Sequence, residues 1–405
     1  MLGLAVAVAC TDREPPRDED LAREGAPGTP TEPTPTVDRA AEPPDHEPDR
    51  ARDGAAPTNP SPPTEPTPSP EPRAESLDLV FVGDVVLGEY VFDGHRSFAG
   101  PLAPGDPFAD VAELLKADLV VGNLESPVMH EIPEKSPLRY GHRFGASAPA
   151  VEGLAAGGFD VMSVANNHAN DLGREGLEQT PEVLRKAGIT PVGEARHDGS
   201  PLRVVTLEHR GWRIGFLSAT TWLNHAPEPG DPSAPVVAVS RLKRTLVPLV
   251  EQARTDHDLV IVLLHWGRER RERPEPAQIH AAHAFIDAGA DLVIGHHPHV
   301  LQGIERYGDG LIAYSLGNFL FPAREDAFRD SAVLRVTVMT EPHLVAEATT
   351  HSIRLRQAPQ HAPRPTTGLE RRIIDEQMQR LGRGLRTRWQ RDREGSRLVS
   401  VARPP

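Results

Sequence analysis

Residues 292–299 read Leu-Val-Ile-Gly-His-His-Pro-His, a short apolar run followed by three histidines within four positions. The apolar run predicts a buried strand over residues 292–294. Three imidazoles this close together repel one another on protonation and bring no structural benefit. The stretch therefore predicts a strand of a buried sheet with a polar site at its carboxyl end.

Further apolar runs lie on both sides of this stretch. The predicted strands span residues 79–82, 119–121, 161–164, 203–207, 214–217, 259–264, 292–294, 311–314 and 333–339. Amphipathic stretches between several of them predict helices over 107–116, 176–187, 240–255 and 277–288. Strands that are apolar on both faces and are separated by helices are typical of an α/β fold with buried sheets. The sequence has no GxGxxG, P-loop or GxSxG motif.

Polar side chains of metal-binding types follow nearly every predicted strand. They are Asp84, Asn123, Glu125, Asn166, Asn167, His168, His265, His296, His297 and His299. In open α/β sheets, ligands bind outside the carboxyl ends of the strands, so these groups are expected to converge. Imidazoles, carboxylates and an amide oxygen together suit metals such as Mn, Fe or Zn. The sequence therefore predicts a metal site at this edge of the sheets.

Each of these segments also has a plainer explanation. The pair Gly83-Asp84 after a strand is most often a turn or a helix N-cap. Residues 166–168 are compatible with the start of a helix, and His265 is compatible with an ordinary hydrogen-bonded histidine. These alternatives do not explain the three histidines of residues 296–299, nor the set as a whole.

The N-terminal part of the chain differs in composition from the rest. Residues 11–76 contain 17 prolines, and 16 acidic against 7 basic side chains. Such a stretch cannot bury enough apolar surface to offset its ordering entropy, so we expect a disordered linker. The linker carries most of the formal charge of −14. Residues 77–357 remain as one mildly acidic folded domain, for which no nucleic-acid partner is expected.

The first ten residues predict a membrane anchor. Residues 2–9 are a run of small apolar side chains, and Cys10 follows directly. This order resembles the end of a bacterial lipoprotein signal, whose cysteine is lipidated. The match lacks a basic stretch before the run, and Ala7 stands where leucine is usual, so an incidental cysteine is the alternative. Lipidation at Cys10 would place the domain outside the cytoplasm at the cell envelope, with the linker as a spacer.

The C-terminal segment, residues 358–405, is rich in arginine. One helix is expected there, from Gly368 to Arg383. We expect this segment to cap the domain, and a basic surface patch is the alternative. No segment after the N-terminus approaches 18 consecutive apolar residues, so no further membrane-spanning helix is expected.

Several motifs, taken in order, resemble one known family. They are Phe81-Val82-Gly83-Asp84, Gly122-Asn123-Leu124-Glu125, Ala165-Asn166-Asn167-His168 with Asp171 and Gly173, His265-Trp266-Gly267 with Glu269, His297-Pro298-His299, and Tyr314-Ser315-Leu316-Gly317-Asn318-Phe319. Over about residues 77–340, this pattern resembles the CapA family of poly-γ-glutamate capsule synthesis, a branch of the calcineurin-like metallophosphatase superfamily. The resemblance implies a four-layer α/β (α+β) sandwich of two facing mixed sheets flanked by helices.

The resemblance also implies roles for individual residues. The implied metal ligands are Asp84 and His299 at a first ion, Glu125 between the ions, and Asn167, His265 and His297 at a second ion. His168 matches a catalytic histidine that binds no metal but protonates a leaving group or stabilises charge. The chain departs from the superfamily at Val86, where a histidine is usual, and at Glu125, where aspartate is usual. A single ion at the second position is therefore the alternative to two.

The implied chemistry suits an anionic substrate. Two divalent metals can activate water and clamp the oxygens of a displacement, and their charge favours anions. We expect a metal-dependent envelope protein of the CapA type with hydrolase-like chemistry. It would act in the synthesis, transport or anchoring of an anionic polymer such as poly-γ-glutamate, with a capsule-synthesis membrane complex as a partner. The alternatives are a general phosphoesterase acting on a small substrate and a non-catalytic module that binds a carboxylate-rich polymer.

Overall fold

The computed structural model describes residues 72–92, 95–98, 106–132, 143–323, 325–340, 344–357, 360–385, 387–391 and 395–399. Cys10 and nearly all of the expected linker lie outside the described residues. Within the described part of the chain, no helix is long and apolar enough to cross a membrane.

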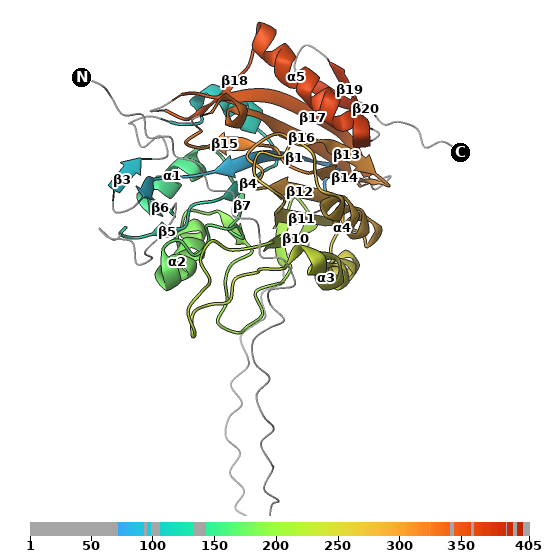
Figure 1. The fold of residues 1–405 in the computed structure, drawn as a ribbon. Helices are drawn as coiled ribbons and strands as arrows, with labels where there is room; N and C mark the ends of the chain where they lie inside the picture. Colours follow the sequence, from blue (N-terminus) through green and yellow to red (C-terminus); the bar gives the residue numbers. More distant parts are fainter. Residues whose placement is uncertain are drawn as a thin grey trace, which may run out of the picture. The chain divides into compact units, whose positions relative to one another are not determined.

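The larger of the two main sheets is mixed (Figure 1). Its strands are β1 (Ser76–Val85), β4 (Leu119–Leu124), β7 (Val161–Ser163), β8 (Thr190–Val192), β15 (Asn318–Leu320), β16 (Asp330–Met339), β17 (Leu344–Leu355), β18 (Pro363–Pro365), β19 (Arg388–Arg391) and β20 (Ser396–Val399). Their order is β19-β20-β17-β16-β1-β4-β7-β8, with β15 paired to β1 and β18 paired to β17. Strands β1, β4, β7 and β8 are parallel, so their carboxyl ends share one edge.

The smaller main sheet is also mixed. Its strands are β9 (Val205–His209), β10 (Trp212–Thr220), β11 (Leu259–His265), β12 (Leu292–His296), β13 (Ile304–Tyr307) and β14 (Gly310–Ala313). Their order is β13-β14-β12-β11-β10-β9, and β10, β11, β12 and β14 run parallel. A third, small sheet contains β2 (Glu89–Phe92), β3 (His95–Phe98), β5 (Val128–Met129) and β6 (Arg143–Ser147).

The two main sheets face each other across a shared hydrophobic core. Successive side chains of a strand point to opposite faces of its sheet. In β1, Leu79 and Phe81 enter the core that also contains Ile261 of the smaller sheet. Val80 and Val82 point the other way, into a separate core formed with helices. Each sheet is therefore buried on both faces, as the apolar runs predict.

Helices cover the outer faces of both sheets. Helices α1 (Pro149–Ala156) and α2 (Gly173–Lys186) pack on the larger sheet, and α3 (Leu242–Asp256) and α4 (Pro276–Asp287) pack on the smaller one. The predicted four-layer α/β sandwich is thus confirmed. The helix predicted over residues 107–116 is present as η2 (Ala109–Leu115), which is a 3-10 helix.

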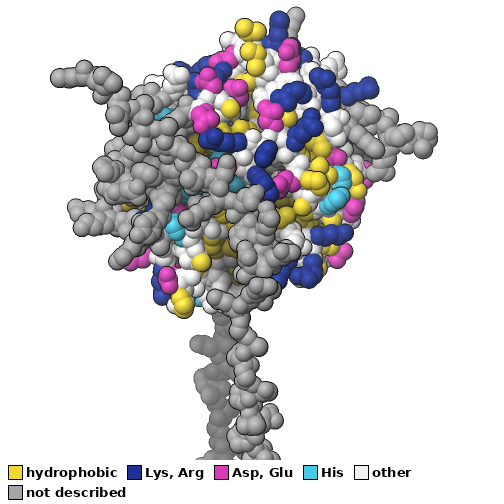
Figure 2. Space-filling view, viewed as in Figure 1, with side chains coloured by type: hydrophobic (Ala, Val, Ile, Leu, Met, Phe, Trp, Pro, Cys, Tyr) yellow, Lys and Arg dark blue, Asp and Glu magenta, His cyan; other side chains and the backbone are white. Residues whose placement is uncertain are grey.

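The C-terminal helix α5 (Gly368–Gly382) lies where a helix is expected from the sequence. Ile374 and Met378, one turn apart, are buried in the core between the sheets. Figure 2 shows basic side chains on this side of the molecule with acidic side chains among them. The contacts of α5 therefore favour a cap on the domain. The remaining 3-10 helices are η3 (Val239–Arg241), η4 (Asp326–Phe328) and η5 (Arg383–Leu385).

Ordered contacts begin before Leu77, where the folded domain is expected to start. The backbone N–H of Ala74 donates to the carbonyl oxygen of Arg210 at 3.0 Å. The indole N–H of Trp212 donates to the carbonyl oxygen of Ala74, also at 3.0 Å. Composition does not reveal these contacts because they use the backbone of Ala74. The last residues assigned to the linker therefore belong with the domain.

Candidate metal centre

The centre forms where the strands of both sheets end. Asp84, the next-to-last residue of β1, is in register with Asn123 of β4 and with Asn318 of β15. The approach of β15 depends on Gly83, because a Cβ atom at that position would lie 2.0 Å from the carbonyl oxygen of Gly317. A glycine is required where two backbones come this close. In the pair Gly83-Asp84, the glycine is therefore required by packing, and the aspartate is an expected metal ligand.

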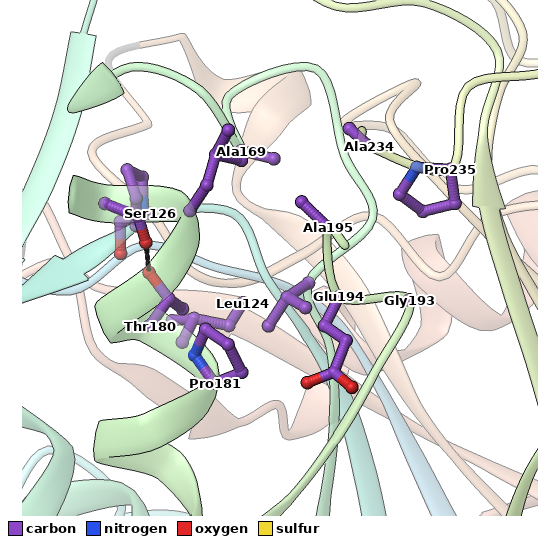
Figure 3. A pocket seen from close by; sticks show the side chains of 14 residues that line it. Leu124, Ser126, Ala169, Thr180, Pro181, Gly193, Glu194, Ala195, Ala234 and Pro235 are labelled. Atoms are coloured by element: carbon purple, nitrogen blue, oxygen red, sulfur yellow. Dashed lines mark hydrogen bonds between the residues drawn. The ribbon is translucent and has the colours of Figure 1, made fainter. Parts of the chain in front are cut away.

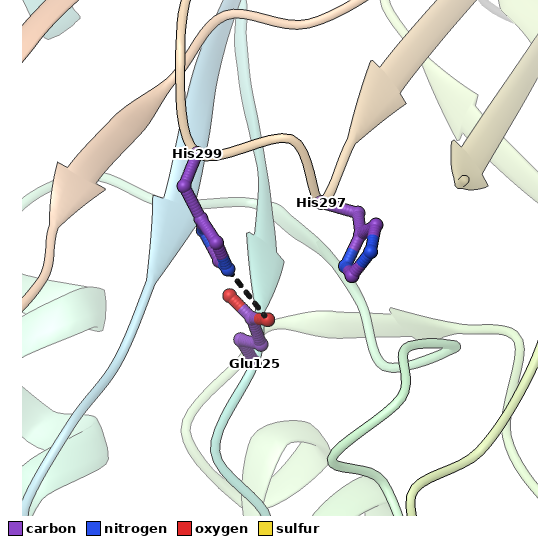
Figure 4. A group of neighbouring side chains, drawn as sticks. All are labelled: Glu125, His297 and His299. Carbon is purple, nitrogen blue, oxygen red and sulfur yellow. Dashed lines mark ion pairs between the residues drawn. The ribbon is translucent and has the colours of Figure 1, made fainter. Parts of the chain in front are cut away.

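The three histidines of residues 296–299 do not all point into the centre. His296 ends β12, and its Nε2 lies 3.2 Å from the carbonyl oxygen of Val82. His297 and His299 follow with positive φ angles of 98° and 58°. Residues other than glycine rarely adopt this left-handed backbone, and it is concentrated at functional sites. The resulting turn directs both imidazoles toward Glu125, which lies directly after β4 (Figure 4).

Glu125 lies at the middle of this group. Its Oε1 is 3.6 Å from Nε2 of His265 and 3.8 Å from Nε2 of His299. One ligand atom from each of Glu125, His297 and His299 can be chosen so that all lie within 4.8 Å of one another. All of these side chains are buried. The residues that the sequence singles out thus converge from β4, β11 and the turn after β12.

The three residues expected at a second ion are in direct contact. Nε2 of His265 lies 2.7 Å from Oδ1 of Asn167 and 3.1 Å from Nδ1 of His297. Nε2 can carry only one proton, and Oδ1 of Asn167 carries none. Nε2 can donate this proton to Oδ1 of Asn167, and the remaining electron pairs of Asn167 and His297 point into the same small volume, an arrangement that suits a cation.

Asp84, in contrast, is held by hydrogen bonds from the chain itself. Its carboxylate accepts from Nδ2 of Asn123 at 2.8 Å and from the backbone N–H of His297 at 3.2 Å. Nδ1 of His299 lies 3.2 Å from the same carboxylate and 2.9 Å from Oδ1 of Asn318. The first expected ligand position is therefore preorganised by its neighbours.

The residues present fit a divalent metal, and Glu125 is the decisive group. Neither carboxylate oxygen of Glu125 accepts a hydrogen bond from the described residues, and the side chain is fully buried. Oδ1 of Asn123 is also buried without a hydrogen bond from the described residues. Burying such acceptors is costly unless they have a partner. A metal ion beside Glu125 would supply that partner.

The protonation properties of the site agree with a missing positive charge. Burial raises the pKa of Glu125 to about 8. Burial alone lowers the pKa of His299, but the charges of Glu125 and Asp84 outweigh it and raise that pKa to about 10. Burial and the charge of His299 lower the pKa of His297 to about 4. In the metal-free chain, the pair Glu125 and His299 thus holds protons more strongly than free side chains do, while His297 stays neutral and able to bind a metal.

His168 occupies a different position from the expected ligands. Its Nδ1 lies 2.6 Å from Oδ2 of Asp171, and the same oxygen accepts the backbone N–H of Phe144 at 2.8 Å. The ring of Phe144 packs on the imidazole, with centroids 4.1 Å apart. Asp171 therefore fixes the ring through Nδ1 and leaves Nε2 to face another partner.

The segment after β10 contributes residues that the sequence reasoning missed. The backbone N–H of Asn224 donates to the carbonyl oxygen of Asn167 at 2.8 Å, and its amide Nδ2 lies 3.3 Å from both ring nitrogens of His168. The ring of Trp222 meets His297 edge to face, with centroids 5.4 Å apart. These residues follow the carboxyl end of a strand, so the rule that identified the other site residues also applies to them.

A small cavity lies between α2 and the segments at residues 193–195 and 234–235 (Figure 3). Its volume is about 20 Å³, and its lining is mostly apolar. Thr180 lines it and donates its hydroxyl proton to the carbonyl oxygen of Gly176 at 2.6 Å. A space of this size holds about one water molecule. It does not accommodate a substrate, so the metal centre remains the candidate functional site.

Comparison with known proteins shows the family of the chain. Residues 78–323, more than half of the sequence, match the family described as bacterial capsule synthesis protein PGA_cap. The chain belongs to this family. The predicted resemblance of the sequence motifs to the capsule synthesis proteins is thereby confirmed.

Two relatives of this capsule synthesis family member carry the CapA name. The chain is 32% identical over 271 residues to the capsule biosynthesis protein CapA of Bacillus anthracis, covering 64% of each chain. It is 31% identical over 265 residues to the PGA biosynthesis protein CapA of Bacillus subtilis, covering 64% of this chain and 67% of that one. The match thus spans less than two thirds of the Bacillus anthracis protein.

One solved structure that the chain resembles is a novel phosphatase from Mycoplasma pneumoniae. The TM-score is 0.47 at 15% sequence identity, and the match covers 70% of this chain and 95% of the phosphatase.

Proposed function

We propose that this chain is a metal-dependent CapA-type protein of the bacterial cell envelope with hydrolase-like chemistry. It would act in the synthesis, transport or anchoring of an anionic capsule polymer such as poly-γ-glutamate, alongside a capsule-synthesis membrane complex. Membership of the capsule synthesis family supports a role with such a polymer. The observation that carries the chemistry is the buried carboxylate of Glu125, which faces His297 and His299 and lacks a hydrogen-bond donor among the described residues.

Six residues would hold the metal. They are Asp84, Glu125, Asn167, His265, His297 and His299. Their mixture of imidazole, carboxylate and amide ligands suits one or two ions of Mn, Fe or Zn. A bound divalent ion would act as a Lewis acid on an oxygen of the substrate and stabilise negative charge that develops there.

The chain's own residues would orient the reaction and move the proton. His168, whose Nδ1 lies 2.6 Å from Asp171, would give a proton from Nε2 to the leaving group. Asn224 would hold the segment that carries Asn167 and His168 through its contacts with both. The rings of Phe144 and Trp222, packed on His168 and His297, would keep water from the reacting groups.

Metal analysis combined with polymer turnover tests this proposal. Purified full-length protein is loaded with Mn, Fe or Zn, its ions per chain are counted, and the chain length of added poly-γ-glutamate is followed with and without a chelator. Glu125→Gln should lose metal and turnover together. Glu152→Gln, an exposed residue on α1, is the matched control and should lose neither. Wild-type protein that takes up no metal, or turnover that survives the chelator, would overturn the proposal.

Lipidation at Cys10 is the proposed means of envelope attachment. The apolar run of residues 2–9 before the cysteine supports it. In a detergent phase separation, wild-type protein should enter the detergent phase and Cys10→Ser should remain in the aqueous phase. Equal partitioning of the two proteins would contradict the anchor and leave the metal centre untouched.

A further inference from the structure

A third strained residue lies beside the two histidines of the turn. Among the described residues, the non-glycine residues with positive φ are Arg210, Arg270, His297, His299 and His361. Arg270 has a φ of 65°, and its backbone N–H donates to the carbonyl oxygen of Pro298 at 2.9 Å. Pro298 is the residue between the two histidines. The turn that directs His297 and His299 into the centre therefore also fixes the backbone of Arg270.

The guanidinium of Arg270 is directed toward the His299 side of the centre. Its Cζ lies 5.1 Å from the centroid of the Phe328 ring, a cation–π distance. The Phe328 ring meets the His299 imidazole edge to face, with centroids 6.3 Å apart. The ring of Phe321 lies on the same imidazole, with centroids 4.6 Å apart. The positive charge of Arg270 thus lies against the ring of Phe328, which in turn contacts the expected metal ligand His299.

The present partner of Arg270 is easily replaced. Nη2 of Arg270 donates to Oε1 of Glu325 at 2.9 Å, and the two side chains are 45% and 56% exposed. An exposed ion pair of this kind contributes little to stability. Arginine has five N–H donors, and this is the one side-chain hydrogen bond that Arg270 makes to the described residues. A second carboxylate can therefore take the place of Glu325 at small cost.

A neighbouring arginine shows what a purely structural role looks like. Nε of Arg268 lies 2.9 Å from Oε1 of Glu275, and these side chains are 47% and 36% exposed. Glu275 is the N-cap of α4, so this pair joins the loop to the start of a helix. Arg268 has an ordinary backbone and no aromatic partner among the described residues. The two arginines make similar ion pairs from one loop, and only Arg270 is connected to the metal-binding turn.

We propose that Arg270 is a substrate-binding residue that recognises a carboxylate of an acidic polymer, displacing Glu325 as the chain enters the centre. Arginine suits this task because its planar guanidinium matches a carboxylate in a bidentate manner. The carboxylate would bind to Arg270 beside the Phe328 ring while a neighbouring bond of the polymer reaches the metal. This inference rests on the proposed function and adds the residue that would recognise the carboxylates of that polymer.

Direct binding measurements separate Arg270 from the metal. The affinity of metal-loaded, full-length protein for a poly-γ-glutamate oligomer is measured by calorimetry, and ions per chain are counted for each variant. Arg270→Ala should weaken binding roughly 10- to 100-fold, the usual effect of losing a charge-assisted hydrogen bond. Glu325→Gln should tighten binding by roughly 2- to 5-fold, because the competing carboxylate is removed. Arg268→Ala should bind like wild type.

The outcomes distinguish this inference from the proposed function. Binding of an oligomer whose carboxylates are methyl esters should be weak and equal in wild type and Arg270→Ala. If Arg270→Ala and Arg268→Ala bind the acidic oligomer equally, or if Glu325→Gln weakens binding, Arg270 is a structural residue and the inference is overturned. If the wild type binds the oligomer through Arg270 but holds no metal, the inference stands and the proposed metal-dependent function fails.

Discussion

The two halves of the metal centre satisfy their polar groups in different ways. Asp84 accepts hydrogen bonds from Asn123 and from the backbone of His297, and it lies beside Nδ1 of His299. On the other side, Nε2 of His265 lies 2.7 Å from Oδ1 of Asn167, to which it can donate its single proton, and 3.1 Å from Nδ1 of His297. Asp84 therefore has several hydrogen-bond donors, whereas Oδ1 of Asn167 has one, Nε2 of His265, among the described residues.

This difference indicates where a metal would be held most strongly. When a side chain gives up hydrogen bonds within the protein to bind a metal, its net gain in free energy is only the difference between the two interactions. A ligand group with fewer hydrogen bonds gives up less when it binds the metal. We therefore expect the ion at Asn167, His265 and His297 to be the tighter one. The same side retains all its expected ligands, whereas near Asp84 the chain has Val86 at a position where the resemblance implies a histidine.

The largest expected effect is the loss of the tighter ion. His265→Ala should lower metal affinity by more than 100-fold, because even second-shell changes around a metal cost 10- to 100-fold. Metal-dependent turnover should disappear with it. Asp84→Asn, the matched change in the other half, should cost less affinity. Competition with a chelator of known affinity measures both variants, and a larger loss in Asp84→Asn would reverse the comparison.

The next effect concerns His168, which we assign to neither half. His168→Ala should keep wild-type metal content and slow turnover by roughly 10² to 10⁴, the usual contribution of a positioned general acid or base. Ion counting and turnover of the same preparation give both quantities. Asn167→Ala is the comparison variant and should lose metal and turnover together. Loss of metal in His168→Ala would make His168 a ligand, and full activity would leave it a packing residue.

The substitution Gly83→Ala would strain only the part of the candidate centre that contains Asp84. Gly83→Ala would place a Cβ atom 2.0 Å from the carbonyl oxygen of Gly317, beside Asp84. We expect a loss of about 1 to 3 kcal/mol in the free energy of unfolding, the usual range for overpacking. Gly153→Ala in α1 meets no atom within 4 Å and is the control, with a change below about 1 kcal/mol. Equal denaturation midpoints for the two variants would show that β15 moves aside without strain.

A further expected effect is a dependence of stability on pH in the metal-free protein. The pKa of Glu125 is raised from 4.5 to about 8, and that of His299 from 6.5 to about 10. Because both values are raised, the folded state holds extra protons. Their contribution is fully present below the ordinary pKa values and is lost as the pH rises through about 8 and then about 10.

The free energy of unfolding of the metal-free protein should therefore fall between pH 7 and pH 9. The slope is at most about 1.4 kcal/mol per pH unit for each retained proton. Metal-loaded protein should show a shallower slope, since the ion replaces the protons. Denaturant titrations at each pH measure both forms. Parallel slopes with and without metal would place the ion away from Glu125 and His299.

Much of this centre could be predicted from the sequence because its ligands follow short apolar strands. Asp84, His265 and the turn after residue 296 were found by their positions at strand ends, and the structure brings them together. The segment with Trp222 and Asn224 was missed although it obeys the same rule. Its side chains of metal-binding types, Asn224 and His225, come four and five residues after the end of β10 and not directly at the strand end, so the pattern was overlooked.

The fold was predictable where hydrophobic runs are long and was missed where they are short. The two main sheets follow from strands that are buried on both faces. The small sheet of β2, β3, β5 and β6 was not anticipated, and neither was the twelve-residue β17 of the larger sheet, because none of these strands contains more than three consecutive apolar residues. Such strands depend on pairing with distant partners more than on their own pattern.

The sequence alone determined which chemical groups lie at the strand ends, because strand burial and residue type are local properties. Only the tertiary structure decided how those groups are partnered. His296 and His297 are adjacent, yet one faces the carbonyl oxygen of Val82 and the other faces the centre. Glu125 lacks a hydrogen-bond donor among the described residues, whereas Asp84 has several. Partnership depends on backbone direction and on contacts between segments far apart in the chain, and no local pattern records either.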